Sequence, residues 1–255
     1  MRTIALSSCL FLCLALSALS AQAPHEVPIR NEPNHHLVLD NAYVNVFRVS
    51  FPGHAASLIH QHDVPYLYVS LGPADIMNAI QGRPELHQVL ADGQVGYSPG
   101  HFAHLVRTDA GIPFNNVTIE LLKPQGEIRN RCDKITEGPL HDCEKPSPAA
   151  AANSPMTALG RAISIRPLFE TDELLATSYA ITLKQTYTET DSPGGTPRPR
   201  LLIVQMGSEV RAEVEGETPK IVDGGEAMWL DGAKSWKLFL PGGKSATRFV
   251  LIAFR

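Results

Sequence analysis

Two histidines with one residue between them, His60 and His62, begin a run of alternating apolar residues in LIHQHDVPYLYVSLG at 58–72. Side chains two residues apart on a β-strand point to the same side, so both imidazoles face one way. Imidazole nitrogens bind zinc, iron, copper and nickel. The pair therefore predicts part of a metal site, and the remaining ligands must come from elsewhere in the chain.

A third histidine, His104, follows in GQVGYSPGHFAHLV at 93–106. Together the two segments resemble the two sequence motifs of the cupin family. The matching residues of the first motif are Gly53, His60, His62 and Gly72, with one extra residue after Gly53, and those of the second are Gly93, Pro99 and His104. The resemblance covers roughly residues 40–123.

This resemblance implies an all-β fold, a jelly-roll β-barrel with a metal held inside by histidines of both motifs. The implied ligands are His60, His62 and His104, and the ion is a divalent iron, zinc, copper, nickel or manganese. The glutamate of the first motif is missing, because its place falls at Tyr66 or Leu67. Three neutral ligands leave the ion its full charge and an open position, which suits a Lewis-acid or substrate-chelating role.

Three further residues are candidates for proton handling at such a site: Tyr66, Tyr68 and His101. His101 stands where the second motif has glycine. Each residue has a plainer alternative, since strand tyrosines also pack in cores and a turn histidine also lies at a surface. No cofactor other than the metal is expected.

Residues 1–23 have the pattern of a secretory signal peptide: Arg2, an apolar stretch, then Ala21-Gln22-Ala23. We expect its removal, a secreted or periplasmic protein, and no stable membrane insertion afterwards, with an uncleaved membrane anchor as the alternative. Cys132 and Cys143 then remain and are expected to form a disulfide, with zinc binding as the alternative.

Overall composition narrows the class of protein. The formal net charge of −4 gives no electrostatic footprint for nucleic acid. The chain has 20 prolines and 19 glycines with only 19% charged residues, which favours a turn-rich β protein. Nucleic acid is therefore not an expected partner, and the metal site that the resemblance implies predicts a small-molecule substrate or ligand.

Period-2 patterning between turn signals predicts many short strands, typical of sandwiches and barrels. They cover 43–51, 65–71, 75–80, 86–90, 94–98, 102–107 and 115–122, then 177–187, 199–206, 209–214, 226–230, 235–240 and 246–254. Residues near 157–170 are predicted as a short lead-in helix or strand.

The second half of the chain resembles the first, which predicts two tandem barrels. Residues 92–106 align without a gap to 224–238, so that Trp236 takes the place of His104, and 68–72 align to 203–207. No histidine occurs after His141, so the second barrel lacks the ligands. The expected organisation is a signal peptide at 1–23, a metal-binding domain at 24–123, a linker at 124–156 and a degenerate cupin-like domain at 157–255.

Three functions are consistent with these features. The first is an enzyme, a metal-dependent dioxygenase acting on a small oxygenated or aromatic substrate. The second is a non-catalytic metal or small-ligand binding protein of the cell envelope. The third is a structural protein whose histidines have lost their role. A homodimer is an additional expectation, because cupins often dimerise through their sheets.

Overall fold

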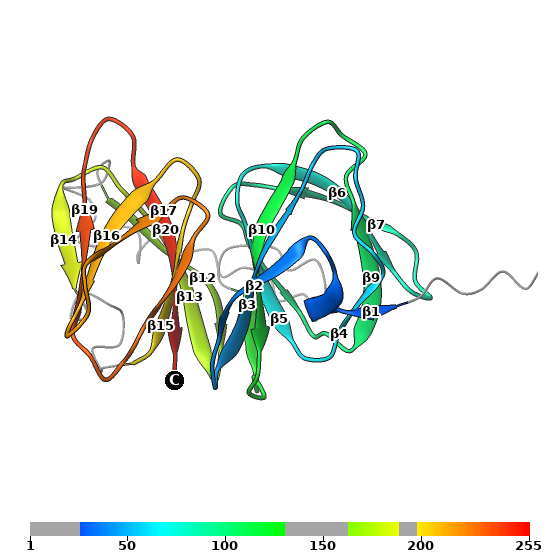
Figure 1. Cartoon of the computed structure of the whole chain (residues 1–255), viewed down its shortest axis with the longest axis horizontal. Coiled ribbons are helices and arrows are strands. Elements are labelled where there is room, and N and C mark those ends of the chain that lie inside the picture. Colours follow the sequence, from blue (N-terminus) through cyan, green and yellow to red (C-terminus); the bar gives the residue numbers. More distant parts are fainter. Residues whose placement is uncertain (1–25, 131–162, 189–197) are drawn as a thin grey trace, which may run out of the picture.

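The computed structural model describes residues 26–130, 163–188 and 198–255. Apart from the short 3-10 helix η1 (Ile29–Asn31), the regular elements in these ranges are strands, and they form four sheets. Figure 1 shows the sheets as two β-barrels side by side. Within the described ranges, no helix has the length and hydropathy of a membrane span.

The first barrel consists of two five-stranded sheets that enclose a lumen. One sheet has the order β1 (Val27–Pro28), β4 (His60–His62), β9 (Phe102–Arg107), β6 (Ala74–Ile80) and β7 (Leu86–Leu90). The other has the order β2 (His35–Asp40), β3 (Val44–Phe51), β10 (Phe114–Leu121), β5 (Tyr66–Ser70) and β8 (Val95–Ser98).

The second barrel repeats this arrangement. Its six-stranded sheet has the order β11 (Ile128–Asn130), β12 (Ile163–Thr171), β13 (Leu174–Ile181), β20 (Thr247–Phe254), β15 (Arg200–Val204) and β18 (Ala227–Leu230). Its four-stranded sheet has the order β14 (Gln185–Thr188), β19 (Trp236–Leu240), β16 (Glu209–Val214) and β17 (Lys220–Asp223).

Strand order bears out the internal repeat. The order β4-β9-β6-β7 recurs as β14-β19-β16-β17, and β2-β3-β10-β5-β8 recurs as β12-β13-β20-β15-β18. Trp229 pairs with Leu201 as Tyr97 pairs with Leu67. This register makes Leu202 the counterpart of Tyr68. The sequence alignment of 68–72 with 203–207 had placed Ile203 there, so within the strand it was wrong by one residue. Such a shift would turn every side chain of the strand to the opposite face of the sheet.

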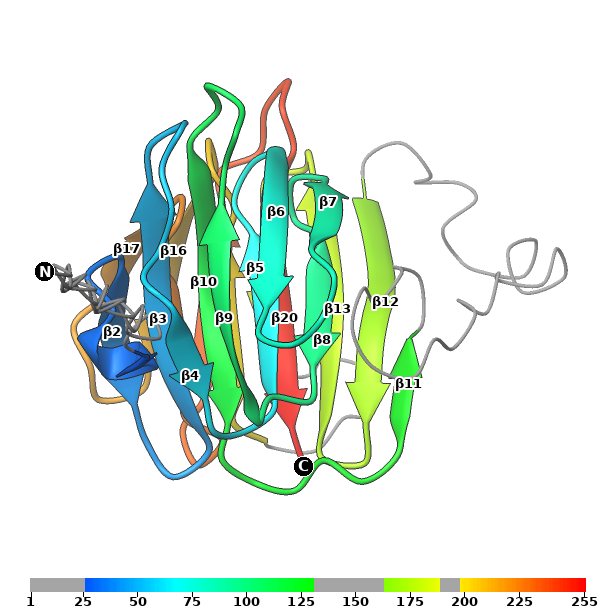
Figure 2. The same cartoon turned by 90° about the vertical axis from the view of Figure 1, so that its right-hand side faces the viewer.

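Most predicted strands are present, and the differences lie at turns and edges. The stretch 177–187 contains two strands, β13 and β14, instead of one. The lead-in segment is the strand β12. Residues 128–130, which the sequence assigned to the linker, form β11 and pair with β12 at the edge of the second barrel (Figure 2). The expected signal peptide and both cysteines lie outside the described residues.

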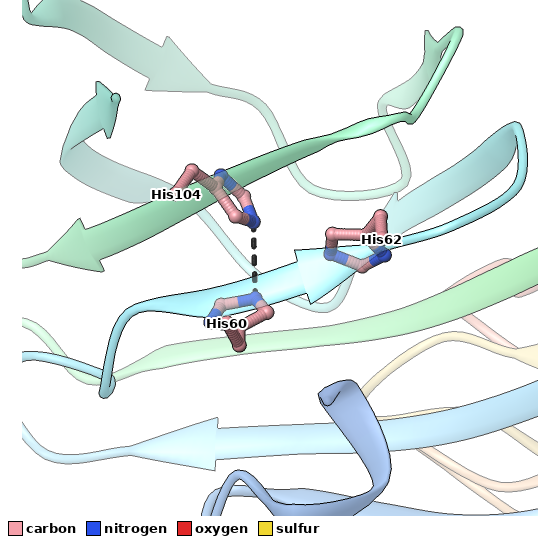
Figure 3. A group of neighbouring side chains, drawn as sticks. All are labelled: His60, His62 and His104. Atoms are coloured by element: carbon pink, nitrogen blue, oxygen red, sulfur yellow. Dashed lines mark hydrogen bonds between the residues drawn. The ribbon is translucent and has the colours of Figure 1, made fainter. Parts of the chain in front are cut away.

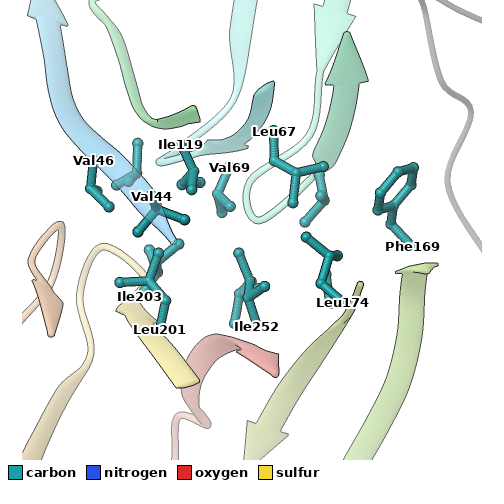
Figure 4. Packing of buried hydrophobic residues seen from close by; sticks show 14 of the residues in the cluster. Val44, Val46, Leu67, Val69, Ile119, Phe169, Leu174, Leu201, Ile203 and Ile252 are labelled. Carbon is teal, nitrogen blue, oxygen red and sulfur yellow. The ribbon is translucent and has the colours of Figure 1, made fainter. Parts of the chain in front are cut away.

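A shared apolar core joins the two barrels. In β3, Val44 and Val46 face the second barrel, whereas Phe47 and Val49 face the lumen of the first. Leu67 of β5 belongs to the same interbarrel cluster. Figure 4 shows these side chains packed against partners from the second barrel, among them Phe169, Leu174, Leu201, Ile203 and Ile252. The central strands β3, β10 and β5 of this sheet are therefore largely buried on both faces, whereas the edge strand β2 is mostly exposed. These packed central strands form the back wall of the lumen.

Candidate metal centre

Strands β4 and β9 bring three histidines together inside the first barrel. His60 and His104 are directly opposite each other in the antiparallel β4–β9 pair. His62 lies two residues further along β4, on the same face as His60. All three side chains are buried, and one ligand nitrogen from each lies within 4.8 Å of the others. Figure 3 shows the three rings converging from the two strands.

The Nε2 atoms of His60 and His104 lie 3.0 Å apart. Two nitrogens bound to one zinc ion at about 2.0–2.1 Å would be roughly 3.3 Å apart in tetrahedral geometry. The spacing of the two imidazoles is therefore close to that of two ligands of one metal ion.

Hydrogen bonds fix the orientation of these two rings. His60 Nδ1 donates to the carbonyl oxygen of Leu58 at 3.0 Å, and His104 Nδ1 donates to Asn78 Oδ1 at 2.9 Å. With the proton on Nδ1 in each ring, each Nε2 carries a lone pair. Two lone pairs then face each other across 3.0 Å, an arrangement that a cation between them would stabilise.

His62 is held differently. Its ring stacks on Tyr66 with centroids 4.0 Å apart, while its buried Nδ1 has no hydrogen-bond partner among the described residues. The carboxylate of Glu120 on β10 lies 3.8 Å from this nitrogen, which is too long for a hydrogen bond.

The lumen keeps the imidazoles neutral. Burial, followed by the charge of His35, lowers the pKa of His60 to about 4. Burial, followed by the neighbouring imidazoles, also places the pKa values of His62 and His104 well below the ordinary range. Since neutral imidazole is the form that binds a metal, the three rings are ready for a divalent ion at neutral pH.

The three residues expected to handle protons have different positions. Tyr66 and Tyr68 on β5 line the lumen together with the histidines. His101 lies in the turn between β8 and β9, where its side chain is exposed and does not line the lumen. Its backbone N–H donates to the carbonyl of His62 at 2.6 Å, so the residue supports the site through its main chain.

Sequence reasoning missed a buried carboxylate–imidazole pair from the N-terminal segment. Glu32 accepts a hydrogen bond from His35 Nδ1 at 2.5 Å and another from the backbone N–H of Leu58 at 3.1 Å. The ring of His35 lies 4.5 Å from that of His60, centroid to centroid, and lines the lumen. The spacing Glu32-x-x-His35 was visible in the sequence, but the residues precede both motifs.

Charge on Glu32 is strongly stabilised. Burial by itself would raise the pKa of this carboxyl, but hydrogen bonds from His35, Leu58 and Asn34 outweigh burial and lower the pKa to about 2. Glu32 thus ties the N-terminal segment to the start of β4, next to the backbone carbonyl that orients His60.

The free space beside the histidines is small, a cavity of about 40 Å³. Its other walls are largely apolar, with Val49, Phe51, Ile76, Leu90 and Phe114. One water molecule needs roughly 10–15 Å³ by this kind of measure, so the cavity holds a few waters or a compound of a few atoms. Apolar walls around a polar end are typical of small-molecule sites.

The second barrel has a filled lumen in place of a site. Trp236, the counterpart of His104, is 2% exposed. It packs with Tyr187 and Phe249 in an apolar cluster that also contains Leu202 and Leu238. Within the described part of this barrel there is no group of three residues able to hold a metal.

Comparison with known proteins gives similarity in structure alone. No family model and no curated protein matches the sequence. AerE from Microcystis aeruginosa is 11% identical with a TM-score of 0.54, over 88% of this chain and 98% of AerE. A mutant of salicylate 1,2-dioxygenase from Pseudoaminobacter salicylatoxidans is 9% identical with a TM-score of 0.53, over 83% of this chain and 71% of the dioxygenase.

A plant protein is also similar in fold over most of the chain. The vicilin from Solanum melongena, which has different anionic ligands in structurally similar pockets, is 11% identical. It aligns with a TM-score of 0.50 over 83% of this chain and 75% of the vicilin. At such identities the similarity establishes the fold.

Proposed function

Because the chain has the two-barrel fold of the cupin superfamily, we propose that it is an exported protein that binds one divalent metal ion in its first barrel. His60, His62 and His104 are the ligands. The proposed activity is that of a metal-dependent dioxygenase acting on a small oxygenated or aromatic compound.

One observation is the main support for the proposed metal site. His60 Nε2 and His104 Nε2 face each other at 3.0 Å while both Nδ1 atoms are occupied by oxygen acceptors. Leu58 contributes a carbonyl, which can only accept, so His60 must carry its proton on Nδ1. A proton shared between the rings is disfavoured because burial lowers the pKa of both. A metal cation satisfies the two lone pairs without protonating either ring.

A bound divalent ion would supply a Lewis acid with at least one open position. The residues of the chain have the other tasks. Apolar walls such as Phe51 and Phe114 would shield a compound bound in the cavity from bulk water. Tyr66 and Tyr68 are the nearby phenols that can hold or donate a proton to a bound compound.

The choice of dioxygenase chemistry has two supports. The salicylate 1,2-dioxygenase shares the fold over 83% of this chain, and its name states an oxygenated aromatic substrate. The aromatic and aliphatic lining of the cavity suits an apolar body with a polar end.

The cavity volume favours a second candidate, a binding protein without turnover. About 40 Å³ leaves room beside the ion for a few atoms, and an aromatic substrate would require side chains to move. A carrier or sensor of the metal, or of the metal with a small anion, needs no such opening.

Metal analysis of the purified protein tests the site. We expect one divalent ion per chain in the wild type and none in His104→Ala. His101→Ala is the matched control, since this exposed histidine is close in sequence and should leave the metal content unchanged. Metal retained in His104→Ala would show that the ligands are misassigned.

Turnover separates the two candidates. Oxygen uptake by the metal-loaded protein is measured with small aromatic carboxylates, catechols and β-diketones. Uptake that falls in Tyr66→Phe while the metal content stays constant supports an enzyme. A flat response to all compounds with the metal bound favours the binding protein.

Export is tested by sequencing the N-terminus of the mature protein, which should begin after Ala23.

A further inference from the structure

The three proposed ligands differ in how their second nitrogen is satisfied. Nδ1 of His60 and Nδ1 of His104 each donate to an oxygen, whereas Nδ1 of His62 is buried with no hydrogen-bond partner in the described part of the chain. When Nε2 of a histidine binds a metal, Nδ1 carries the proton. His62 would then hold a buried N–H that requires an acceptor.

Glu120 lies beside this nitrogen, and a small shift of either side chain would bring the two within hydrogen-bond distance. Its Oε1 lies 3.8 Å from His62 Nδ1, and its side chain is buried. Its other oxygen, Oε2, accepts a hydrogen bond from Asn45 Nδ2 at 2.9 Å. Asn45 in turn accepts from Arg30 Nη2 at 2.9 Å, which fixes the amide so that its NH2 group faces the carboxylate. This chain of contacts leaves Oε1 to face His62.

The position of Glu120 in the sheet bears on the glutamate that is missing from the first motif. The glutamate of the first motif is missing, and Tyr66 stands at or beside its position. Glu120 on β10 is the residue paired with Tyr66 on the neighbouring strand β5. A carboxylate therefore lies one strand away from the place where the motif has one.

We propose that Glu120 is the carboxylate of this metal site, acting on the ion through His62 and not as a ligand. It accepts the Nδ1–H of His62 and so orients this ring. Its charge offsets part of the charge of the ion in a lumen whose ligands are neutral. The inference rests on the proposed function, because it requires that the three histidines hold a metal.

Two observations separate this role from direct coordination. The group of ligand atoms within 4.8 Å of one another contains the three histidines and not Glu120. The carboxylate oxygen approaches Nδ1 of His62, whereas a further ligand would have to approach the Nε2 atoms of His60 and His104, which face each other. A carboxylate behind a metal-bound histidine orients the ring and makes it a stronger ligand.

The test uses Co²⁺, which reports on its ligands through its visible spectrum, in the full-length protein. Affinity is measured by competition with a chelator for wild type, Glu120→Gln and Glu120→Ala. We expect Glu120→Ala to bind Co²⁺ about 10- to 100-fold more weakly, the usual effect of losing such a partner. Glu120→Gln keeps an oxygen acceptor but loses the charge, so its Co²⁺ affinity and spectrum should lie between those of the wild type and those of Glu120→Ala.

The matched control is Glu85→Gln, which removes a carboxylate from the outer surface of the same barrel, where it pairs with Arg107. It should bind Co²⁺ like the wild type. Unfolding in the presence of a chelator distinguishes a merely structural role: Glu120→Gln should unfold at the wild-type temperature without metal but gain less stability from Co²⁺.

Wild-type affinity and spectrum in both Glu120 variants would overturn the inference while leaving the metal site intact. A wild type that binds no Co²⁺ would overturn the proposed function and this inference with it.

Discussion

Imidazoles in the first barrel are oriented by acceptors behind them. Leu58 and Asn78 accept from His60 and His104, so the Nε2 atoms point into the lumen. The pair Glu32–His35 and the residue Glu120 add two buried carboxylates around the rings. A buried carboxylate is costly unless hydrogen-bonded, and both accept hydrogen bonds from the chain. The polar lumen is thus organised for a positive charge at its centre.

We expect the metal-free protein to lose stability as the pH falls from about 6.5 to about 4. Folded His60 has a pKa of about 4, against a usual value of 6.5 in the unfolded chain. Between these values the unfolded chain binds a proton that the folded chain does not, so acid favours unfolding. His60 alone would contribute on the order of 3 kcal/mol over this range. Denaturant unfolding in a chelator at several pH values measures the effect.

His60→Gln is the control for this pH dependence. The substitution removes the titrating ring, so the variant should show a shallower loss of stability between pH 6.5 and 4. The same slope as in wild type would contradict the assignment to His60. Glu32 acts at lower pH: its stabilising charge is present above about 4.5 and is lost as the pH falls toward 2.

Among the elements, the turn between β8 and β9 explains one departure from the cupin motif. Gly100 and His101 both have positive φ, of 68° and 61°. His101 occupies the motif position of glycine, the residue that adopts this left-handed conformation without strain. A Cβ at Gly100 would lie 2.0 Å from the carbonyl oxygen of Val64. Within this turn, Gly100 is therefore the position that does not accept a side chain.

Two substitutions in this turn should have opposite effects. His101→Gly removes the cost of holding a residue with a Cβ in the left-handed conformation, but it also raises the conformational entropy of the unfolded chain. The free energy of unfolding should therefore stay the same or rise by up to about 1 kcal/mol. Gly100→Ala clashes with the backbone between β4 and β5 and should cost more than about 2 kcal/mol. Denaturant unfolding measures both. Loss of metal in a folded His101→Gly protein would show that His101 has a direct role at the site.

Across the whole molecule, the two barrels share one architecture and differ in what fills them. The interbarrel core makes each barrel the support of the other, and an ion pair between Arg248 and Asp92 crosses the same boundary. Polar side chains and a cavity occupy the first lumen, whereas aromatic and aliphatic side chains fill the second. The second barrel therefore packs against the back of the sheet that forms one wall of the first lumen.

Trp236→Ala tests whether the packed lumen of the second barrel affects stability alone and not the metal content. Removing a large side chain from a packed lumen should lower the free energy of unfolding by about 3–5 kcal/mol, because a cavity remains. The metal content of the folded protein should remain one ion per chain, since Trp236 belongs to the barrel without histidines. Thermal unfolding and metal analysis on the same sample provide both readouts. A folded variant without metal would show that the second barrel takes part in the site.

The sequence by itself determined the all-β class, the two tandem barrels and the three histidines that meet in the lumen. These follow from local features: alternation marks strands, glycine and proline mark turns, and the two motifs have definite spacing. The sequence did not predict β2, although Pro33-Asn34 and Asp40-Asn41 are turn signals on its two sides. It also predicted one strand over 177–187, where residues 182–184 separate β13 from β14.

Only the tertiary structure decided which residues surround the histidines. Glu32 and His35 precede both motifs, and Glu120 lies 58 positions after His62, so no local pattern connects them with the site. Pairing of β10 with β5 and packing of the N-terminal segment beside β4 bring them there. The same packing left His101 outside the lumen. Distance along the chain says nothing about such contacts, because strands far apart in sequence become neighbours when the barrel closes.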